Sequence, residues 1–372
     1  MKIAVFIEDS GAPHDTFSIV ARELVSGLAR GLRPILIRSR PPDWKGPGRS
    51  RLHGVPCYSL GRWGGVGHRL RSAVHSAWIL RRERADLAHL HLAGLDAWGF
   101  ALADALRRTP YVLTFHAFSP ARFRARGLCE RLALRRLLGR ARAVTAVSVA
   151  ARRDLEAEIP EMAGRVRVVP NGLTRRPATS APTVPPAEGE GRFILSVGAP
   201  SFEKGTDLLL FSFADLLRLG RPDLRLVVCG RGERASLFED MSRRLGVADR
   251  VQLLGPLPQE RVRSLMDRCL LYAAASREES FGLAVLEAMA AGKAVAAAAV
   301  GGLPELVSDG ETGLLFAAGS VAGLSAALER LLDDENLRGR LGAAARAASA
   351  RYSWSTACRA YQDLYVSAMA GA

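Results

Sequence analysis

The chain has 372 residues, 48% of them hydrophobic and 24% charged, which is the balance of an ordinary globular protein large enough for two domains. Residues 1–190 hold 31 of the 52 Lys and Arg but 16 of the 37 Asp and Glu, so the whole excess of +15 falls there, and the remaining 21 and 21 cancel. No apolar run approaches the roughly 20 residues that span a bilayer, which argues against a transmembrane protein.

Short apolar or β-branched runs alternate with amphipathic stretches of helical length along the whole chain, a pattern typical of parallel sheets covered by helices. In the first half the expected strands are Ile3–Ile7, Ile35–Ile37, Leu87–His91, Tyr111–Phe115, Ala143–Val147 and Val166–Val169. In the second half they are Phe193–Val197, Leu224–Cys229, Val251–Leu254, Leu270–Ala273 and Ala294–Ala298. Helices are expected between them, for example over Phe17–Arg30, Asp207–Leu219 and Val321–Leu332.

A Pro- and Gly-rich stretch with almost no large apolar residue separates the two sets of strands, and its composition is that of a linker. We therefore predict an α/β domain over residues 1–172, a linker over 173–191, a second α/β domain over 192–352 and a terminal helix over 353–372. Open parallel sheets bind ligands at the carboxyl ends of their strands.

The five cysteines are scattered and never form a C-x-x-C pair, which indicates free thiols in a reducing compartment. The start, MKIAVFIEDS, has an apolar run of only five residues and suits a core strand better than a signal peptide. We expect a soluble cytoplasmic protein, at most peripheral on the cytoplasmic face of a membrane.

Residues 278–295 (EESFGLAVLEAMAAGKAV) carry the most chemical information. Ser280, Phe281 and Gly282 look like a helix start, and Leu283–Ala291 is apolar except for Glu287, so a buried helix with one buried carboxylate is expected. The free amides of a helix start suit a phosphate, with Glu279 at its mouth. On spacing alone, Glu279 could equally be a solvated loop residue, and Glu287 a cap on a neighbouring backbone group.

These residues resemble the signature of the retaining GT-B glycosyltransferases (group 1, glycogen-synthase- and mannosyltransferase-like): two glutamates eight apart around F-G-L, then L-E-A-M-A-x-G. The likeness covers most of the second half, through G-G-L-P-E-L at 301–306 and T-G-L-L at 312–315 after the signature, and G-R-G at 230–232 before it. It implies a GT-B fold, two Rossmann-like domains facing each other across a cleft, and a nucleoside diphosphate sugar as donor.

By this resemblance Glu279 contacts the donor sugar and stabilises charge at the reacting centre, Glu287 holds the ribose hydroxyls, and Lys204, one of only four lysines, neutralises the diphosphate. The other expected donor-binding residues are Ser280, Phe281, Gly282, Leu283, Arg231 and Leu254. The alternative for Lys204 is a solvated loop lysine. One departure is Ala199, because the family commonly has an arginine there as a second cation on the diphosphate. In this chain Arg231 is the candidate for that role.

On the acceptor side, Thr-Phe-His at 114–116 resembles the family's acceptor-side histidine, which makes His116 a candidate catalytic residue; the alternative is an ordinary loop histidine. Gly11 is the only glycine in the loop after the first strand. By the resemblance, this loop approaches the acceptor and the diphosphate. His89 and His91 alternate on one strand without a third metal ligand at a convincing spacing.

The resemblance implies sugar transfer with retention to a hydroxyl of a glycan, lipid-linked or small-molecule acceptor. We expect no metal and no cofactor, because no D-x-D pair is present and Lys204 with helix amides would carry the diphosphate. The alternatives are a catalytically inactive nucleotide-sugar-binding scaffold, favoured by Ala199, and a nucleotide-sugar epimerase.

Two segments concentrate the positive charge: residues 61–84 hold six arginines and two tryptophans, and residues 121–142 hold eight arginines. Arginine and tryptophan on an amphipathic stretch suit the headgroup boundary of an anionic membrane. A solvated basic face and an acidic soluble acceptor are the alternatives. No recognisable module supports a nucleic acid partner.

Overall fold

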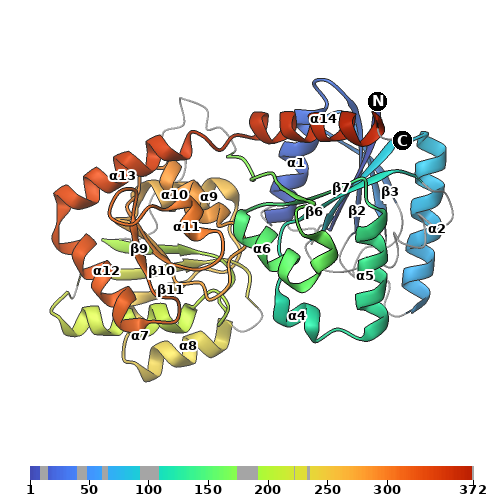
Figure 1. Cartoon of the computed structure of the whole chain (residues 1–372). Coiled ribbons are helices and arrows are strands. Elements are labelled where there is room, and N and C mark those ends of the chain that lie inside the picture. Colours follow the sequence, from blue (N-terminus) through green and yellow to red (C-terminus); the bar gives the residue numbers. More distant parts are fainter. Residues whose placement is uncertain are drawn as a thin grey trace. The chain divides into compact units, whose positions relative to one another are not determined.

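The computed structural model of the protein describes residues 1–8, 16–39, 48–60, 66–92, 109–173, 192–221, 223–232 and 235–370. It divides into two compact units (Figure 1): unit 1 comprises Met1–Thr174 with Tyr352–Ala372, and unit 2 comprises Arg175–Arg351. Each unit is built on its own sheet.

The sheet of unit 1 has the strand order β3-β4-β2-β1-β5-β6-β7-β8 and is parallel except for the antiparallel edge strand β3. Its strands are β1 (Lys2–Glu8), β2 (Arg33–Ser39), β3 (Gly48–Leu52), β4 (Val55–Leu60), β5 (Leu87–Leu92), β6 (Tyr111–Phe115), β7 (Ala143–Ala146) and β8 (Val166–Val168). The central strands are buried on both faces, as their apolar runs predict.

Helices cover both faces of this sheet. On one face, α2 (Val66–Glu83), α4 (Pro120–Arg124), α5 (Leu128–Arg140) and α6 (Val149–Glu158) bury their apolar side chains in one cluster with Ala4, Leu90 and Leu113. On the other face, α1 (Thr16–Leu28) and α14 (Trp354–Ala370) pack on Ile3, Val5 and Val112. The alternation along each strand therefore sorts the side chains into two separate cores.

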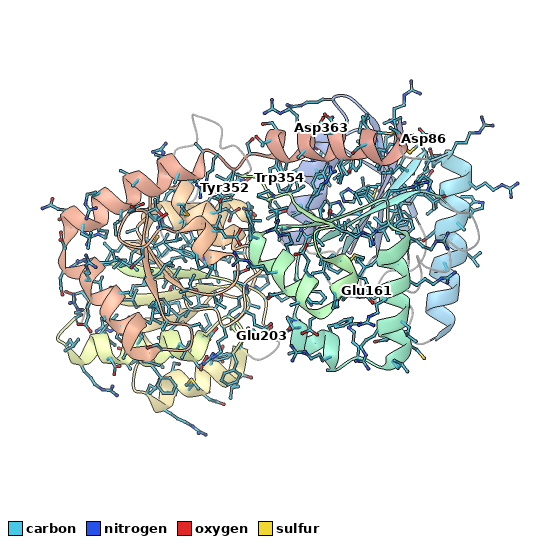
Figure 2. All side chains as sticks on the ribbon, in the orientation of Figure 1. Asp86, Glu161, Glu203, Tyr352, Trp354 and Asp363 are labelled. Atoms are coloured by element: carbon cyan, nitrogen blue, oxygen red, sulfur yellow. The ribbon has the colours of Figure 1, made fainter. Side chains whose placement is uncertain are left out.

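The terminal helix predicted from the sequence belongs to unit 1 although the chain reaches it through unit 2. It packs against α1 (Figure 1), and Figure 2 labels Tyr352 and Trp354 where the chain enters it. Gly172 lies so close to this entry that a Cβ would stand 2.1 Å from the Trp354 backbone nitrogen. A side chain at position 172 would therefore push the helix start away.

Unit 2 has a six-stranded, fully parallel sheet in the order β11-β10-β9-β12-β13-β14. Its strands are β9 (Phe193–Val197), β10 (Arg225–Cys229), β11 (Val251–Leu253), β12 (Leu271–Ala274), β13 (Val295–Ala298) and β14 (Leu314–Phe316). Its helices are α7 (Thr206–Arg218), α8 (Ala235–Arg244), α9 (Gln259–Arg268), α10 (Leu283–Ala290), α11 (Leu303–Leu306), α12 (Val321–Asp333) and α13 (Glu335–Ser349).

The structure adds three strands, β3, β4 and β14, that the sequence did not predict. The β3–β4 hairpin turns at His53 and Gly54, both with positive φ (48° and 81°), the geometry of a tight two-residue turn. Its first strand, GRSRL, is too rich in arginine to show an apolar pattern, because an edge strand needs to bury little.

None of the helices in the described ranges is both long and apolar enough to cross a membrane. All five cysteines are free thiols, as predicted, and four of them are buried.

The core of unit 2 offers a matched pair of phenylalanines on α7, because Phe213 is 1% exposed and Phe211 is 41% exposed. We expect Phe213→Ala to lower the free energy of unfolding by about 4 kcal/mol, and Phe211→Ala by less than about 1 kcal/mol. Chemical denaturation followed by far-UV circular dichroism measures both, since all five tryptophans fall within unit 1. Equal losses would contradict the assigned burial.

Candidate active site

A cluster of polar contacts in unit 2 lies where its strand order reverses. Strands β9 and β12 are neighbours, and the chain winds outward from them in opposite directions, through β10 on one side and β13 on the other. Loops that leave such a pair at its carboxyl end diverge and leave space for a ligand. The loop after β9 carries Lys204, and the loop after β12 carries Glu279.

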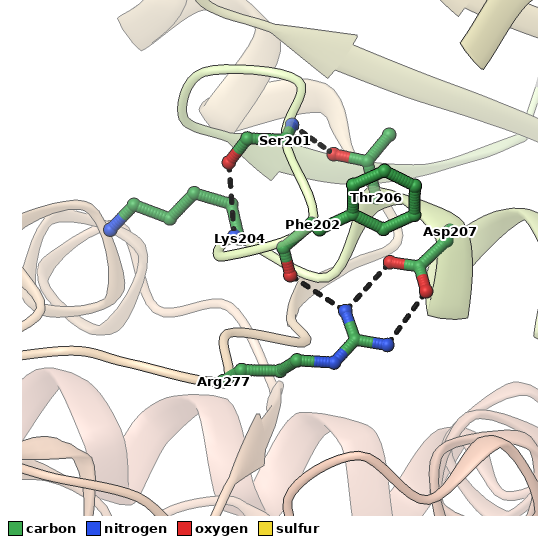
Figure 3. Close-up of polar contacts among 6 residues, drawn as sticks. All are labelled: Ser201, Phe202, Lys204, Thr206, Asp207 and Arg277. Atoms are coloured by element: carbon green, nitrogen blue, oxygen red, sulfur yellow. Dashed lines mark hydrogen bonds and ion pairs between the residues drawn. The ribbon is translucent and has the colours of Figure 1, made fainter. Parts of the chain in front are cut away.

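The loop after β9 is a tight turn that hydrogen-bonds to itself (Figure 3). The Ser201 backbone N–H donates to Thr206 Oγ1 (3.0 Å), and the Lys204 backbone N–H donates to Ser201 Oγ (3.1 Å). Gly205 has φ +67°, and a Cβ on it would lie 1.9 Å from the Ala275 carbonyl oxygen. Only glycine therefore lets this loop rest against the loop after β12.

Arg277 ties the two loops together (Figure 3). Its Nη1 and Nη2 donate to the Asp207 carboxylate at 2.7 and 2.6 Å, and Nη1 also donates to the Phe202 carbonyl oxygen at 2.6 Å. Its backbone N–H donates to the Glu203 carbonyl oxygen at 2.7 Å. A bidentate guanidinium–carboxylate pair fixes direction as well as distance, so Arg277 sets the spacing of both loops.

Lys204 and Glu279 form an ion pair within this frame, with Lys204 Nζ 2.7 Å from Glu279 Oε2. Glu279 is half-buried, so it is not the fully solvated loop residue that spacing alone allowed. Behind it, the Gly302 backbone N–H donates to the Glu279 carbonyl oxygen at 2.9 Å. A Cβ on Gly301, whose φ is +54°, would stand 1.8 Å from the same oxygen.

Helix α10 begins directly after this loop, with Gly282 as its N-cap in a left-handed conformation (φ 95°). The prediction of a helix start at Ser280, Phe281 and Gly282 is therefore confirmed, and Leu283 is its first residue. Glu287 lies one turn further on. Its Oε1 accepts a hydrogen bond from Gln259 Nε2, the first residue of α9, at 3.0 Å.

The expectation of a helix buried all round is wrong for α10. Leu283, Ala284, Glu287 and Ala290 recur at helical spacing and are half-buried, so a stripe of the helix remains accessible. Alanines and one leucine make the stripe look apolar in the sequence, although the described residues of unit 2 do not cover it completely.

Gly230 and Gly232 bring Arg231 against the loop that contains Ala199. A Cβ on Gly230 would lie 2.2 Å from the Gly198 carbonyl oxygen and 2.9 Å from the Ala199 nitrogen, and one on Gly232 would lie 2.7 Å from Pro200 Cδ. The Gly230 N–H donates to the Gly255 carbonyl oxygen at 2.8 Å, next to Leu254. The structure thus gathers Arg231 and Leu254 around the loop of Lys204.

In unit 1, His116 follows β6 at the carboxyl edge of the sheet and is buried. Its Nε2 lies 2.7 Å from His91 Nδ1 on the neighbouring strand β5. Burial lowers the pKa of His116 to about 4 and that of His89 to about 3, so both rings are neutral at pH 7. Gly11 lies outside the described residues.

Three residues of these clusters were not predicted as site residues from the sequence: Arg277, Asp207 and Gln259. Their partners are 70 and 28 positions away along the chain, so no local pattern marks them. The only available signal was the position of Arg277, two residues before Glu279.

Two family models match the chain in succession. The model described as Glycosyl transferases group 1 matches residues 180–348, which include every predicted donor-side residue from Lys204 to Glu287. The model described as Glycosyltransferase Family 4 matches residues 18–175, which include His116.

The D-inositol 3-phosphate glycosyltransferase of Nocardia farcinica is 32% identical over 321 residues, 79% of this chain and 70% of that protein. The protein of the same name from Corynebacterium aurimucosum is 38% identical over 184 residues, 48% of this chain. There the matched part of the chain spans only 44% of the relative's length.

Among solved structures, sucrose-phosphate synthase from Thermosynechococcus elongatus superposes with a TM-score of 0.85 at 20% identity over the whole of both chains. The Anabaena protein HepE in complex with UDP and glucose superposes with a TM-score of 0.78 at 20% identity, over 99% of this chain and 100% of that one. At this identity the likeness carries the fold, and the predicted GT-B fold is confirmed.

A comparison of substitutions at Gly301 and Gly310 distinguishes the cost of close packing from the cost of backbone strain. Both have positive φ, but a Cβ on Gly310 would meet nothing within 4 Å. We expect Gly310→Ala to lower the free energy of unfolding by about 1 kcal/mol, from strain alone, and Gly301→Ala to lower it by about 1–3 kcal/mol more. Denaturation of both variants measures the difference. Equal losses would mean that the Glu279 carbonyl does not rest on Gly301.

Proposed function

Because the chain belongs to the group 1 glycosyltransferases, we propose that it transfers a sugar from a nucleoside diphosphate sugar to an acceptor hydroxyl with retention at the anomeric carbon. The observation that supports this most directly is the Lys204–Glu279 pair at the strand switch point of unit 2, beside the free amides of α10. A cation, a carboxylate and a helix start together suit a diphosphate that is followed by a hydroxyl-bearing sugar.

In the proposed reaction the bond from the anomeric carbon to the diphosphate oxygen breaks, and a bond to the acceptor oxygen forms on the same face. The leaving phosphate takes up the acceptor's proton. Glu279 stabilises the positive charge that develops on the sugar, while Lys204 and the α10 amides stabilise the charge on the diphosphate. Glu287, oriented by Gln259, holds the ribose hydroxyls.

Arg231 is proposed as the second cation on the diphosphate. Position 199 offers only a methyl group, but the close packing of Gly230 and Gly232 puts Arg231 against the same loop. With two side-chain cations and helix amides available, we propose that the reaction needs no metal and no cofactor. Turnover that is unchanged in excess EDTA is the expected result.

His116 is proposed to act from unit 1, toward the reacting sugar and the acceptor. As a neutral imidazole it can donate or accept a hydrogen bond but carries no charge. The relatives named for an inositol phosphate acceptor make a small phosphorylated polyol the first soluble acceptor to test, and the basic excess of residues 1–190 suits it. Thermal-shift screening with a panel of nucleotide sugars would identify the donor.

A membrane-proximal or lipid-linked acceptor is the second proposal, and two helices support it. Helices α2 and α5 bury side chains in the same core cluster, so they cover the same face of the unit 1 sheet. Their outer sides expose Trp78 (47%), Leu128 (63%) and Leu132 (54%) among arginines, and the Arg82 guanidinium lies 4.9 Å from the centre of the Trp78 ring. This combination suits anionic headgroups, and we propose a cytoplasmic enzyme that docks there.

Replacing the Glu279 carboxylate tests the chemistry directly. Glu279→Gln should keep the fold but lower turnover about 100-fold or more, because it removes charge stabilisation at the reacting centre. Glu278→Gln, at the exposed neighbouring position, is the matched control and should remain near wild type. A folded Glu279→Gln enzyme with wild-type turnover would remove the catalytic assignment. Binding without turnover in the wild type would favour the inactive scaffold, and donor isomerisation without an acceptor would favour the epimerase.

Removing the Lys204 ammonium tests the diphosphate site. Lys204→Ala should weaken binding of UDP or ADP by about 1.5–3 kcal/mol and leave binding of the free nucleoside unchanged, since only phosphate gains from the charge. Calorimetry with nucleoside and nucleoside diphosphate measures both, and Arg218→Ala, an exposed arginine of the same unit, is the control. Equal losses for the two ligands would place Lys204 away from the diphosphate.

Vesicle co-sedimentation tests the membrane surface. Binding should require anionic lipid, weaken with salt, and fall by about fivefold or more for each of Arg81→Glu and Arg136→Glu, at roughly 1 kcal/mol per basic residue. Arg218→Glu and Arg243→Glu, single variants that each change the charge of unit 2 by the same amount, should have little effect. Equal partitioning into neutral and anionic vesicles, or into neither, would refute docking by this face.

A further inference from the structure

One arginine holds the turn that carries Lys204 on both sides of that lysine. Lys204 stands in the middle of the turn after β9, and Arg277 lies in the loop after β12 (Figure 3). The Arg277 guanidinium donates to the Phe202 carbonyl oxygen, two residues before Lys204, and to the Asp207 carboxylate, three residues after it. The Arg277 backbone N–H donates to the carbonyl oxygen of Glu203, the residue next to Lys204. The path of the chain around Lys204 is therefore set by a residue of the other loop.

Arg277 also fixes the start of the short segment that presents Glu279. It lies two residues before Glu279 in the sequence, and the Glu279 carbonyl oxygen accepts from the Gly302 N–H at 2.9 Å. This segment is therefore held by hydrogen bonds at both of its ends. Arg277 thus acts on both partners of the 2.7 Å contact between Lys204 Nζ and Glu279 Oε2.

The positive charge of Arg277 is already matched by an anion. Both of its η nitrogens donate to Asp207, whose side chain is only 10% exposed, so the pair is not an ordinary solvated ion pair. In Figure 3 the Lys204 side chain extends away from this pair, toward the other side of the turn. A phosphate that binds Lys204 would therefore meet its ammonium on a different side of the turn from the Arg277 guanidinium.

We propose that Arg277 and Asp207 are positioning residues of the donor site: their ion pair holds Lys204 against the diphosphate and Glu279 against the sugar, and neither of the two touches the donor. The consequence for turnover rests on the function proposed above. A displacement of about 1 Å at a reacting group costs about 100-fold in rate, so the two loops need a rigid link. Two parallel hydrogen bonds between a guanidinium and a carboxylate fix direction as well as distance and supply that link.

Three substitutions distinguish positioning from direct binding of the donor. Arg277→Met removes the guanidinium and keeps an aliphatic stem, Arg277→Lys keeps the charge without the bidentate geometry, and Asp207→Asn removes the anion. If Arg277 bound the diphosphate itself, Asp207→Asn would release a cation and strengthen the binding of UDP or ADP. Positioning has the opposite consequence, because Asp207→Asn breaks the same link as Arg277→Met and should weaken binding as well.

A second Arg–Asp pair of unit 2 provides the matched control. Arg221 Nη2 lies 2.6 Å from Asp333 Oδ1, which links the chain beyond the carboxyl end of α7 to the last residue of α12. Since α7 begins directly after the turn of Lys204 and Arg221 follows its other end, this pair lies away from the donor loops. Arg221→Met removes a guanidinium in the same way as Arg277→Met and should leave the donor site unchanged.

The first measurement is amide hydrogen exchange of the full chain without ligand. The backbone N–H groups of Ser201, Lys204 and Arg277 all donate hydrogen bonds within the two loops. Their exchange should be about 10-fold faster or more in Arg277→Met and Asp207→Asn, and unchanged in Arg221→Met. Far-UV circular dichroism checks that each variant is folded, and Arg277→Lys replaces Arg277→Met if the latter fails to fold. Wild-type exchange at these amides in the folded variants would overturn the proposal.

The second measurement is calorimetry with UDP and ADP. Affinity should fall about 10-fold in Arg277→Met and in Asp207→Asn. In the Lys204→Ala protein the same two changes should cost less than about twofold, because they act through Lys204. Losses that add to that of Lys204→Ala would show another route, and tighter binding by Asp207→Asn would show that Arg277 is itself a phosphate ligand. Either result would overturn the proposal.

The third measurement is turnover at saturating donor, which reports on the position of Glu279. Arg277→Met should lower kcat about 10- to 100-fold, Arg277→Lys should lie between it and the wild type, and Arg221→Met should stay within about threefold of wild type. A wild-type kcat in folded Arg277→Met, or an equal loss in Arg221→Met, would overturn the proposal. If the exchange and calorimetry results hold but the wild type transfers no sugar, the proposed function fails and the positioning stands.

Discussion

Neighbouring strands of a parallel sheet must end at the same edge, and in unit 2 this brings together two loops that are 75 residues apart in sequence. The reversal of strand order between β9 and β12 then keeps any helix from covering them. The other features of the site serve this approach. Gly205 and Gly301 allow backbone to touch backbone, and Arg277 holds the loops at a fixed spacing. The Lys204–Glu279 ion pair forms because these two loops are held close together.

The polar groups of the two units are accommodated in different ways, as an ion pair in unit 2 and as neutral rings in unit 1. In unit 2, Lys204 and Glu279 are half-buried and paired with each other, so a phosphate that binds Lys204 exchanges one anionic partner for another. In unit 1, His89, His91 and His116 are buried and neutral, because burial lowers the pKa of each imidazole. Charge is thus present at the Lys204–Glu279 pair and absent from these three histidines.

The sequence predicted those elements whose signal is local. Central strands read as apolar runs, and Glu279, Glu287 and Lys204 stand in short motifs that the structure places around one loop pair. Features that depend on a distant partner were not predictable. Arg277 gives no sign of Asp207, a pair of alternating histidines gives no sign that a third will stack against it, and an amphipathic last helix does not say which sheet it covers. Glu287 was predicted to be buried because its neighbours on the accessible stripe of α10 are mostly alanines, which the sequence does not distinguish from core residues.

The return of α14 to unit 1 has a consequence for biosynthesis. The last strand of that sheet, β8, is complete at Val168, yet the part of one face that α14 covers stays open until residues 354–370 have left the ribosome. At ~5–20 residues per second, roughly ten seconds or more separate the two events, and all of unit 2 is made in between. During that interval the contacts that α14 makes with this face, among them the Tyr365–His89 hydrogen bond, are not yet formed. The nascent first half is therefore a natural client for chaperones, and unit 2 is free to finish folding first.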